Sequence, residues 1–396
     1  MPLQVPRRYL DNAATSWPKP QCVWEAWEQT AREIGAVAGR GGYREALAAD
    51  AIRTRARSKI AHLLGGVDAS RIAFPAGATL ALNMAIHGIL QPGDHVIATA
   101  ADHNATLRPL HWLRSRGTIE TTIVPCDGAG MVDPDCIARA WRPATKLVVC
   151  SHVSNVTGAV QEAAAIGAIA HERAGIFLLD AAQSLGQRPF AVASLNADIV
   201  AAPAHKWLLG PCGVGILWVR PGIELDLLVQ GGTGLASDSL DMPDSFSDRM
   251  EAGTPDVPAL AGLCAAVDWL EEHDGVAIGA QCRALAARCA QRLREIPAVC
   301  VIAPPPGAAL IHLAPIVSFT MEGYDPAELA LLLEQMAGAQ LRSGFHCAAS
   351  VHQYLGTLSG GTVRLSFGPF NTSEDIDAVA DSLEQLSVSA TFGTGQ

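Results

Sequence analysis

Residues 175–184 read Gly-Ile-Phe-Leu-Leu-Asp-Ala-Ala-Gln-Ser, and residues 204–211 read Ala-His-Lys-Trp-Leu-Leu-Gly-Pro. The first stretch is a short apolar run that ends in Asp180, which is typical of a buried strand in a parallel sheet. The second stretch places Lys206 after a histidine and shortly before a Gly-Pro turn. An amine and an acid in this arrangement indicate a site in which both groups face one bound ring.

Apolar, β-branched runs alternate with Ala-rich segments on both sides of these stretches. The predicted strands are residues 95–99, 121–124, 146–150, 176–179 and 198–202, and the predicted helices are 79–90, 104–116, 134–141 and 161–174. Such alternation predicts an α/β fold with a mainly parallel sheet. Ligands of such sheets bind at the carboxyl ends of the strands, where Asp180 and Lys206 both fall.

The alternation stops at residues 221–258, which we interpret as a long functional loop with a polar stretch that begins at Ser237. Long Ala- and Leu-rich helices follow, then a Pro-rich turn at 304–306, a strand at 316–320 and a helix at 326–337. We therefore predict a large domain of residues 16–258, and a smaller α+β domain of residues 1–15 and 259–396.

Composition excludes several classes of protein. The 396 residues carry a formal net charge of −11 and no run of Lys or Arg, so nucleic acid and anionic membranes are poor partners. No segment reaches the roughly 18 apolar residues of a membrane span, and the N-terminus lacks a signal peptide's apolar core. The ten cysteines form no metal-ligand spacing. We expect a cytoplasmic protein with reduced thiols and no metal site.

Three further segments follow predicted strands or open helices. Ala78 and Thr79 begin a helix after a Gly turn and suit a phosphate, while His103 can stack on a ring and Asn155 can reach a ring hydroxyl. Each alone also fits a capped helix, a surface-loop histidine or a turn asparagine. With Asp180 and Lys206 they predict a pyridoxal phosphate site, which needs a lysine for covalent attachment and an acid beside the ring nitrogen.

The chain resembles the cysteine desulfurases of the class V aminotransferase group, which are fold-type I pyridoxal phosphate enzymes. The resemblance runs nearly end to end. Besides the segments above, it is carried by Tyr9-Leu-Asp-Asn-Ala-Ala-Thr15, Gly231-Gly-Thr-Gly234, Glu251-Ala-Gly-Thr-Pro255, Arg342-Ser-Gly-Phe-His-Cys347-Ala and Val363-Arg364-Leu-Ser-Phe-Gly-Pro-Phe-Asn-Thr. It implies a large domain built on a mainly parallel seven-stranded sheet, together with the smaller α+β domain.

The resemblance also implies a role for each matching residue. The cofactor, pyridoxal 5'-phosphate, would be bound covalently by Lys206, and its ring nitrogen would pair with Asp180. His103 would stack on the ring, and Asn155 and Gln183 would reach the ring oxygen. The phosphate would be held by Ala78, Thr79 and His205. Thr233 would reach the phosphate of the other subunit in a homodimer. The substrate carboxylate would be held by Arg364 in a bidentate fork, with Asn155 and Arg342 also in the substrate site.

Cys347 determines the branch of the family. It stands between His346 and Ala348 in a Gly-containing segment close after Arg342, and a nearby cation favours the reactive thiolate. The arrangement resembles the group II desulfurases, which carry this cysteine on a short loop. It implies that L-cysteine is converted to L-alanine and that Cys347 takes the sulfur as a persulfide. The sulfur then passes to an acceptor protein, in pathways such as iron–sulfur cluster assembly.

The sequence departs from the family pattern at two positions. Pro203 stands where relatives commonly have Ser or Thr, and it offers the phosphate neither a hydroxyl nor an N–H. Tyr43, in the stretch 40–44, stands where group II relatives tend to have a histidine. Three alternatives remain open: a selenocysteine lyase, an epimerase or transaminase on the same fold, and a dimeric scaffold with a degenerate site.

Overall fold

The computed structural model describes residues 6–39, 41–235, 238–304 and 312–393. Side chains are described as far as residue 388. Arg40, Ser237 and the prolines at 305 and 306, which the sequence analysis singled out, lie outside the described residues.

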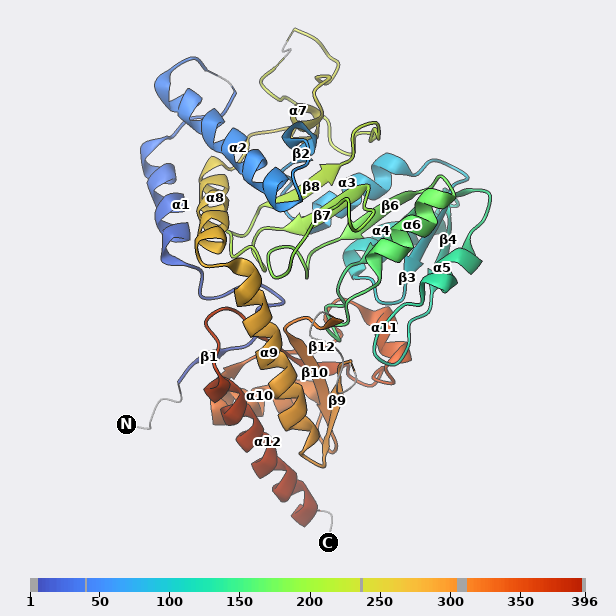
Figure 1. Cartoon of the computed structure of the whole chain (residues 1–396), viewed down its shortest axis with the longest axis vertical. Helices are drawn as coiled ribbons and strands as arrows, with labels where there is room; N and C mark the ends of the chain where they lie inside the picture. Colours follow the sequence, from blue (N-terminus) through green and yellow to red (C-terminus); the bar gives the residue numbers. More distant parts are fainter. Residues whose placement is uncertain (1–5, 40, 236–237, 305–311, 394–396) are drawn as a thin grey trace.

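A seven-stranded sheet forms the centre of the larger part of the molecule (Figure 1). Its order is β2-β8-β7-β6-β5-β3-β4, and the five strands from β7 to β4 are parallel, whereas β8 runs antiparallel to both neighbours. The strands are β2 (Ile72–Ala73), β3 (His95–Thr99), β4 (Glu120–Val124), β5 (Thr145–Ser151), β6 (Ile176–Asp180), β7 (Ile199–Pro203) and β8 (Gly215–Val219). The predicted mainly parallel α/β fold is confirmed.

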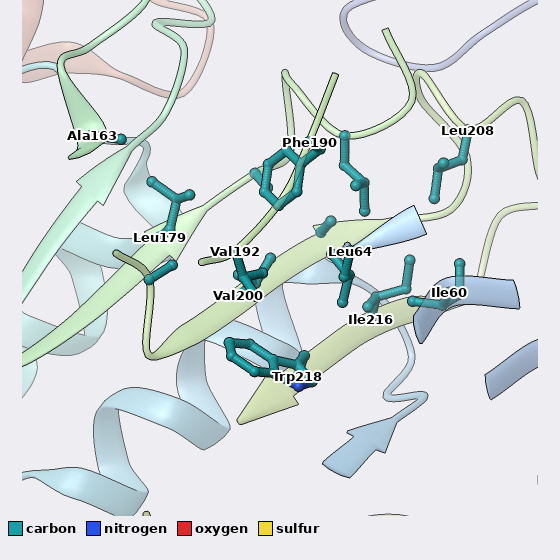
Figure 2. Packing of buried hydrophobic residues seen from close by; sticks show 14 of the residues in the cluster. Ile60, Leu64, Ala163, Leu179, Phe190, Val192, Val200, Leu208, Ile216 and Trp218 are labelled. Atoms are coloured by element: carbon teal, nitrogen blue, oxygen red, sulfur yellow. The ribbon is translucent and has the colours of Figure 1, made fainter. Parts of the chain in front are cut away.

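Successive side chains along these strands enter two different cores, because side chains in a strand alternate between faces. On β8, Ile216 and Trp218 join the core shown in Figure 2, whereas Leu217 and Val219 join the core on the opposite face. Burial on both faces explains why the strands read as continuous apolar runs in the sequence.

Helices cover both faces of the sheet and complete three layers. One face carries α3 (Ala78–Ile89), α4 (Asn104–Ser115) and the short α7 (Phe246–Met250). The other face carries α2 (Arg44–Leu63), α5 (Pro134–Ala140), α6 (Ala163–Glu172) and α8 (Val257–Glu272). The predicted helices and strands of this region match the observed ones to within two residues. The predicted loop at 221–258 is wrong in part, because α7 and the start of α8 lie inside it.

The helix α8 packs against α1 (Gln21–Glu33) and α2, as Figure 1 shows, and its Leu260 and Leu263 are buried in the core of the large sheet. The predicted boundary between residues 258 and 259 falls just inside this helix. The division of the chain into two domains therefore stays a prediction. The packing of α8 gives no sign of a domain boundary at this point.

A smaller antiparallel sheet has the order β12-β13-β10-β9. Its strands are β9 (Val299–Ile302), β10 (Ile316–Met321), β12 (Arg342–Gly344) and β13 (Thr362–Ser366). They share a core with α9 (Gly275–Arg294), α10 (Pro326–Ala337) and α12 (Ser373–Gly393), and the predicted strand and helix at 316–337 are confirmed. The short α11 (Ala349–Tyr354) follows Cys347.

The N-terminal strand β1 (Arg8–Tyr9) pairs in parallel with β11 (Ala339–Gln340), so the start of the chain lies beside the smaller sheet. Among the described helices, none combines the length and the apolar character that crossing a bilayer requires.

Candidate active site

A cavity of about 250 Å³ opens at the carboxyl ends of β5, β6 and β7. The sequence-predicted residues that line it are Ala78, Thr79, His103, Asn155, Asp180, Gln183, His205 and Lys206. These residues are far apart in the sequence and come together because the carboxyl ends of parallel strands meet at one edge of the sheet. The remaining predicted residues, Thr233, Arg342, Cys347 and Arg364, do not line this cavity.

Lys206 lies in a tight turn that follows β7. The Leu209 N–H donates to the Lys206 carbonyl at 3.0 Å, and the Gly210 N–H donates back to the Ala204 carbonyl at 2.9 Å. Leu209 adopts a positive φ of 59°, a backbone conformation that residues other than glycine rarely take. The turn therefore fixes the lysine's backbone at the rim of the sheet.

The charges of Lys206 and Asp180 are strongly affected by burial. Burial lowers the pKa of Lys206 to about 8, and Arg364 and Arg342 act in the same direction, whereas Asp180 raises it. Burial also raises the pKa of Asp180, although the Ala182 N–H, which donates to Oδ1 at 2.8 Å, and Lys206 oppose this. A lysine with this pKa exchanges protons readily near neutral pH.

His103 is the N-cap residue of α4, and its Nδ1 accepts a hydrogen bond from the Ala105 N–H at 3.0 Å. Burial lowers the pKa of His103 to about 4, and the Lys206 and Arg342 charges add to this effect. The ring is therefore neutral at pH 7 and carries its proton on Nε2. Its position on the cavity wall lets it face a planar ligand.

The N-terminus of α3 forms one end of the cavity. Gly77, its N-cap, has a φ of 133°, and no side chain caps the helix, so its first N–H groups remain available to an anion. Gly215 packs directly beneath, where a Cβ would lie 2.4 Å from the Gly77 carbonyl carbon. Beside this end, the buried His205 Nδ1 has no hydrogen-bond partner among the described residues.

Two amides in the cavity wall already bond to the protein. Gln183 donates from Nε2 to the Ala13 carbonyl at 2.9 Å and accepts from Trp207 Nε1 at 2.8 Å, which leaves one N–H of its amide for a ring oxygen. Asn155 donates from Nδ2 to the His346 carbonyl at 2.6 Å. Asn155 thus connects the cavity to the residue before Cys347.

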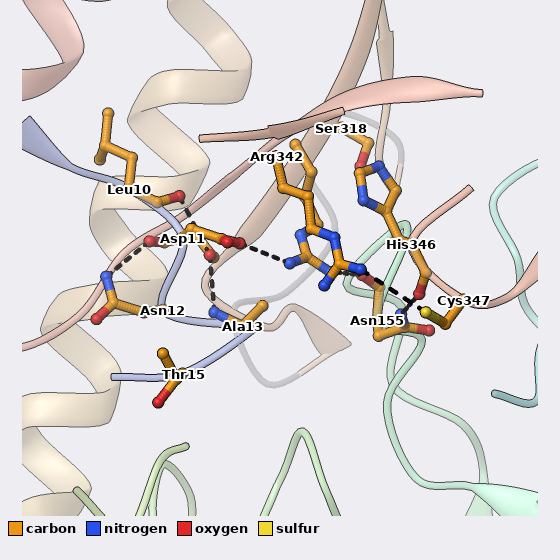
Figure 3. Close-up of polar contacts among 12 residues, drawn as sticks. Leu10, Asp11, Asn12, Ala13, Thr15, Asn155, Ser318, Arg342, His346 and Cys347 are labelled. Carbon is orange, nitrogen blue, oxygen red and sulfur yellow. Dashed lines mark hydrogen bonds and ion pairs between the residues drawn. The ribbon is translucent and has the colours of Figure 1, made fainter. Parts of the chain in front are cut away.

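Cys347 is exposed in a neighbouring cavity of about 570 Å³ that shares Thr79 and His103 with the first. Arg342 Nη2 donates to its Sγ at 3.7 Å, which places the cation where the sequence predicted it (Figure 3). His346 and Cys347 have positive φ values of 49° and 59°, and the Asn104 N–H holds the Cys347 carbonyl at 2.7 Å. A tethered, strained backbone therefore presents the thiol.

Arg364 and Thr233 are placed differently from the cavity residues. Arg364 is buried in β13 and donates to Asp11 Oδ1 at 2.8 Å and to the Asn155 carbonyl at 2.9 Å. Thr233 lies in the loop after β8, where its hydroxyl and Leu235 hydrogen-bond each other. Thr233 is not among the residues that line this chain's own cavity.

Sequence reasoning missed residues in and beside the site, among them Cys212 and Asp102. Cys212, which follows the Gly-Pro turn after Lys206, lines the cavity. Asp102, which precedes His103, is fully buried and accepts from the Thr99 and Ser151 N–H groups at 2.7 and 2.6 Å. Burial raises the pKa of Asp102 to about 7. Their positions beside predicted site residues at strand ends were the available signal.

The two departures from the family pattern occupy different places. Pro203 ends β7 and lines the cavity, so no hydroxyl stands at this point of the wall. Tyr43 is the N-cap residue of α2 and is 57% exposed, outside the residues that line the cavity.

The sequence profile of the class-V aminotransferases matches residues 8–379. The chain belongs to this family. The probable cysteine desulfurase of Methanothermobacter thermautotrophicus is 32% identical over 392 residues, which cover 98% of this chain and 96% of that protein. The cysteine desulfurase CsdA of Escherichia coli is 30% identical over 385 residues, which cover 95% and 93%.

Solved structures agree with the sequence relatives. The apo structure of a cysteine desulfurase from Thermococcus onnurineus NA1 has a TM-score of 0.89 and 30% identity, and the match covers 96% of this chain and 94% of that one. The structure of CsdA from Escherichia coli has a TM-score of 0.84 and 28% identity over 96% and 94%. The predicted membership among the cysteine desulfurases is confirmed.

The burial of Lys206 predicts a pH-dependent stability. Below pH 8 the amine is charged in the folded and unfolded chain alike, and burial penalises that charge in the folded state only. Lys206→Met should therefore raise the free energy of unfolding of the cofactor-free protein at pH 7 by a few kcal/mol, since each pKa unit is worth about 1.4 kcal/mol.

The gain should shrink as the pH rises through about 8 and vanish above the ordinary lysine value of 10.5, where the amine is neutral in both states. Denaturant titrations of parent and variant across this range measure it, with the exposed Lys146→Met as the matched control. A stability difference that does not change with pH would contradict the burial of the charge.

Proposed function

We propose that the enzyme converts L-cysteine to L-alanine, with pyridoxal 5'-phosphate as its cofactor and Cys347 as the first sulfur acceptor. The observation that carries this proposal is the exposed thiol of Cys347, tethered beside a cavity in which a half-buried lysine and a buried aspartate stand together. The relatives named as cysteine desulfurases support the same reaction.

The cavity residues fit the cofactor. The N-terminus of α3, at Ala78 and Thr79, and the His205 Nδ1 suit its phosphate, since neither has a side-chain hydrogen-bond partner within the described part of the chain. Asp180 suits its ring nitrogen, and the neutral ring of His103 suits its face. When bound, pyridoxal phosphate supplies an electron sink for negative charge at the substrate's α-carbon.

The chain's own residues supply proton transfer and orientation. Lys206 Nζ, with its pKa near 8, can take the α-proton of the amino acid and return a proton later. The guanidinium of Arg364 would bind the substrate carboxylate through two parallel N–H groups, one of which, at Nη2, is bonded to Asp11 in this structure, and Asn155 lines the cavity wall. The neutral His103 places no positive charge against the ring.

Sulfur transfer balances without an external oxidant or reductant. The sulfur of Cys347 attacks the sulfur of L-cysteine, an S–S bond forms, and the Cβ–S bond of the substrate breaks. The electron pair of that bond stays with the carbon part, which gains a proton at Cβ and leaves as L-alanine. Cys347 is left as a persulfide, which a thiol of an acceptor protein can receive.

Two partners complete the proposal. A homodimer would bring Thr233 of each subunit to the phosphate end of the other subunit's cavity, since Thr233 does not line the cavity of its own subunit. An acceptor protein would take the sulfur toward uses such as iron–sulfur cluster assembly, in the cytoplasm, where thiols stay reduced.

Cys347→Ser tests the sulfur-accepting role. The variant should bind the cofactor like the parent, since Cys347 does not line the cofactor cavity, and should lose most alanine release from L-cysteine, because a hydroxyl is a poor acceptor for sulfur. Alanine and sulfide are measured together, with Cys300→Ser, at another exposed cysteine, as the control.

Undiminished alanine release from L-cysteine in Cys347→Ser would contradict the desulfurase mechanism. The same assay with selenocysteine separates the alternative activity. If the enzyme is a selenocysteine lyase, Cys347→Ser should keep substantial alanine release from selenocysteine, because selenium leaves more readily and depends less on attack by a thiolate.

Mixed dimers test the role of Thr233 in trans. Lys206→Ala should be inactive, and Thr233→Ala should bind the cofactor more weakly. A mixed dimer of the two variants then contains one complete site, formed by Lys206 of one subunit and Thr233 of the other, and that site should show parental cofactor affinity. Mixed dimers that keep only the weakened affinity would show that Thr233 does not act across the interface.

A further inference from the structure

Two arginines stand directly opposite each other in the smaller sheet. Arg342 on β12 and Arg364 on β13 are register partners in an antiparallel pair. Like charges in such positions destabilise a sheet unless each finds its own counter-group. Arg342 reaches the sulfur of Cys347, and Arg364, which is 1% exposed, reaches Asp11.

Asp11 is held in place by its backbone. The Ser366 N–H, at the end of β13, donates to the Leu10 carbonyl at 2.7 Å, and Asp11 forms an isolated parallel bridge with Ser366. The Ala14 N–H donates to the Asp11 carbonyl at 3.0 Å. The backbone of Asp11 is therefore fixed independently of the salt bridge that its carboxylate makes with Arg364.

The donors of Arg364 are unevenly used. Nη1 donates to the Asn155 carbonyl at 2.9 Å and Nη2 donates to Asp11 Oδ1 at 2.8 Å, whereas Nε is buried without a partner among the described residues. The Nε and Nη2 groups form one edge of the guanidinium, which can bind a carboxylate through two parallel hydrogen bonds. One half of that edge is already taken by Asp11.

We propose that Asp11 is a positioning and specificity residue: its carboxylate holds the donor edge of Arg364 in place of the substrate carboxylate and gives up Nη2 when the substrate arrives. The inference rests on the proposed function, in which Arg364 binds that carboxylate. While the site is empty, Asp11 compensates a buried cation that faces a second arginine. When substrate enters, one carboxylate replaces another, and the charge around Arg364 stays balanced.

The exchange explains why the pair lies at this point of the fold. The Asp11 side chain retains about one-fifth of its exposure, so a carboxylate that leaves Nη2 still has contact with water. A neutral ligand gains nothing by displacing the Asp11 carboxylate, because it would replace a charged hydrogen bond to Arg364 with an uncharged one. Asp11 therefore raises the apparent KM for the amino acid and selects ligands that carry a carboxylate.

Asp11→Asn tests the proposal, since it keeps an oxygen acceptor for Nη2 and removes the competing charge. The affinity for L-alanine, measured by calorimetry on the cofactor-loaded enzyme, should rise about three- to tenfold, the size of one exchanged hydrogen bond. The affinity for L-alaninamide, which lacks the carboxylate, should stay unchanged. The KM for L-cysteine should fall while kcat changes little.

Asp11→Ser, which is also uncharged and shorter, serves as the second variant. Asp377→Asn is the control, because Asp377 pairs with Arg288 at exposed positions of α12 and α9. Equal L-alanine affinities in parent and variants, no binding to any of them, or equal gains for alanine and alaninamide would overturn the role of Asp11. Failure of the proposed function would appear separately, as a parent enzyme that releases no alanine from L-cysteine.

Discussion

The structure depends on the burial of one amine beside one carboxylate. Lys206 and Asp180 reach the same cavity because β6 and β7 are adjacent parallel strands whose carboxyl ends coincide. Burial shifts their two pKa values in opposite directions, which keeps the lysine close to proton exchange at neutral pH. The sheet, its two apolar cores and the tight turn after β7 all serve to hold this pair in place.

The smaller sheet contributes groups that the edge of the large sheet does not supply. Its β12 and β13 carry Arg342 and Arg364, and the segment between β12 and α11 brings Cys347 to the neighbouring cavity. Asn155 joins the two parts, because its Nδ2 donates to the His346 carbonyl and its own carbonyl accepts from Arg364. The groups proposed to bind substrate carboxylate and sulfur are therefore linked by hydrogen bonds to the wall of the cofactor cavity.

Sequence patterns predicted five of the seven strands, because apolar runs buried on both faces leave a strong signal, as in 176–179 and 198–202, whereas β2 and β8 were not predicted. They also identified the residues that follow those runs, including Asp180 and Lys206. The short α7 was missed, since five residues carry little periodicity. Asp102 and Cys212 were missed although each lies close to a predicted site residue. The Asp11–Arg364 pair was missed because it joins distant segments, which no local pattern encodes.

The central claim is that sulfur from L-cysteine passes to Cys347. Mass spectrometry of tryptic peptides after brief exposure to L-cysteine, without an acceptor, tests it directly, because residues 343–364 contain Cys347 as their only cysteine. The account predicts that this peptide gains the mass of one sulfur atom, which a reductant removes. Alanine formation with an unmodified 343–364 peptide, or with the added sulfur on the peptide of Cys212, would contradict it.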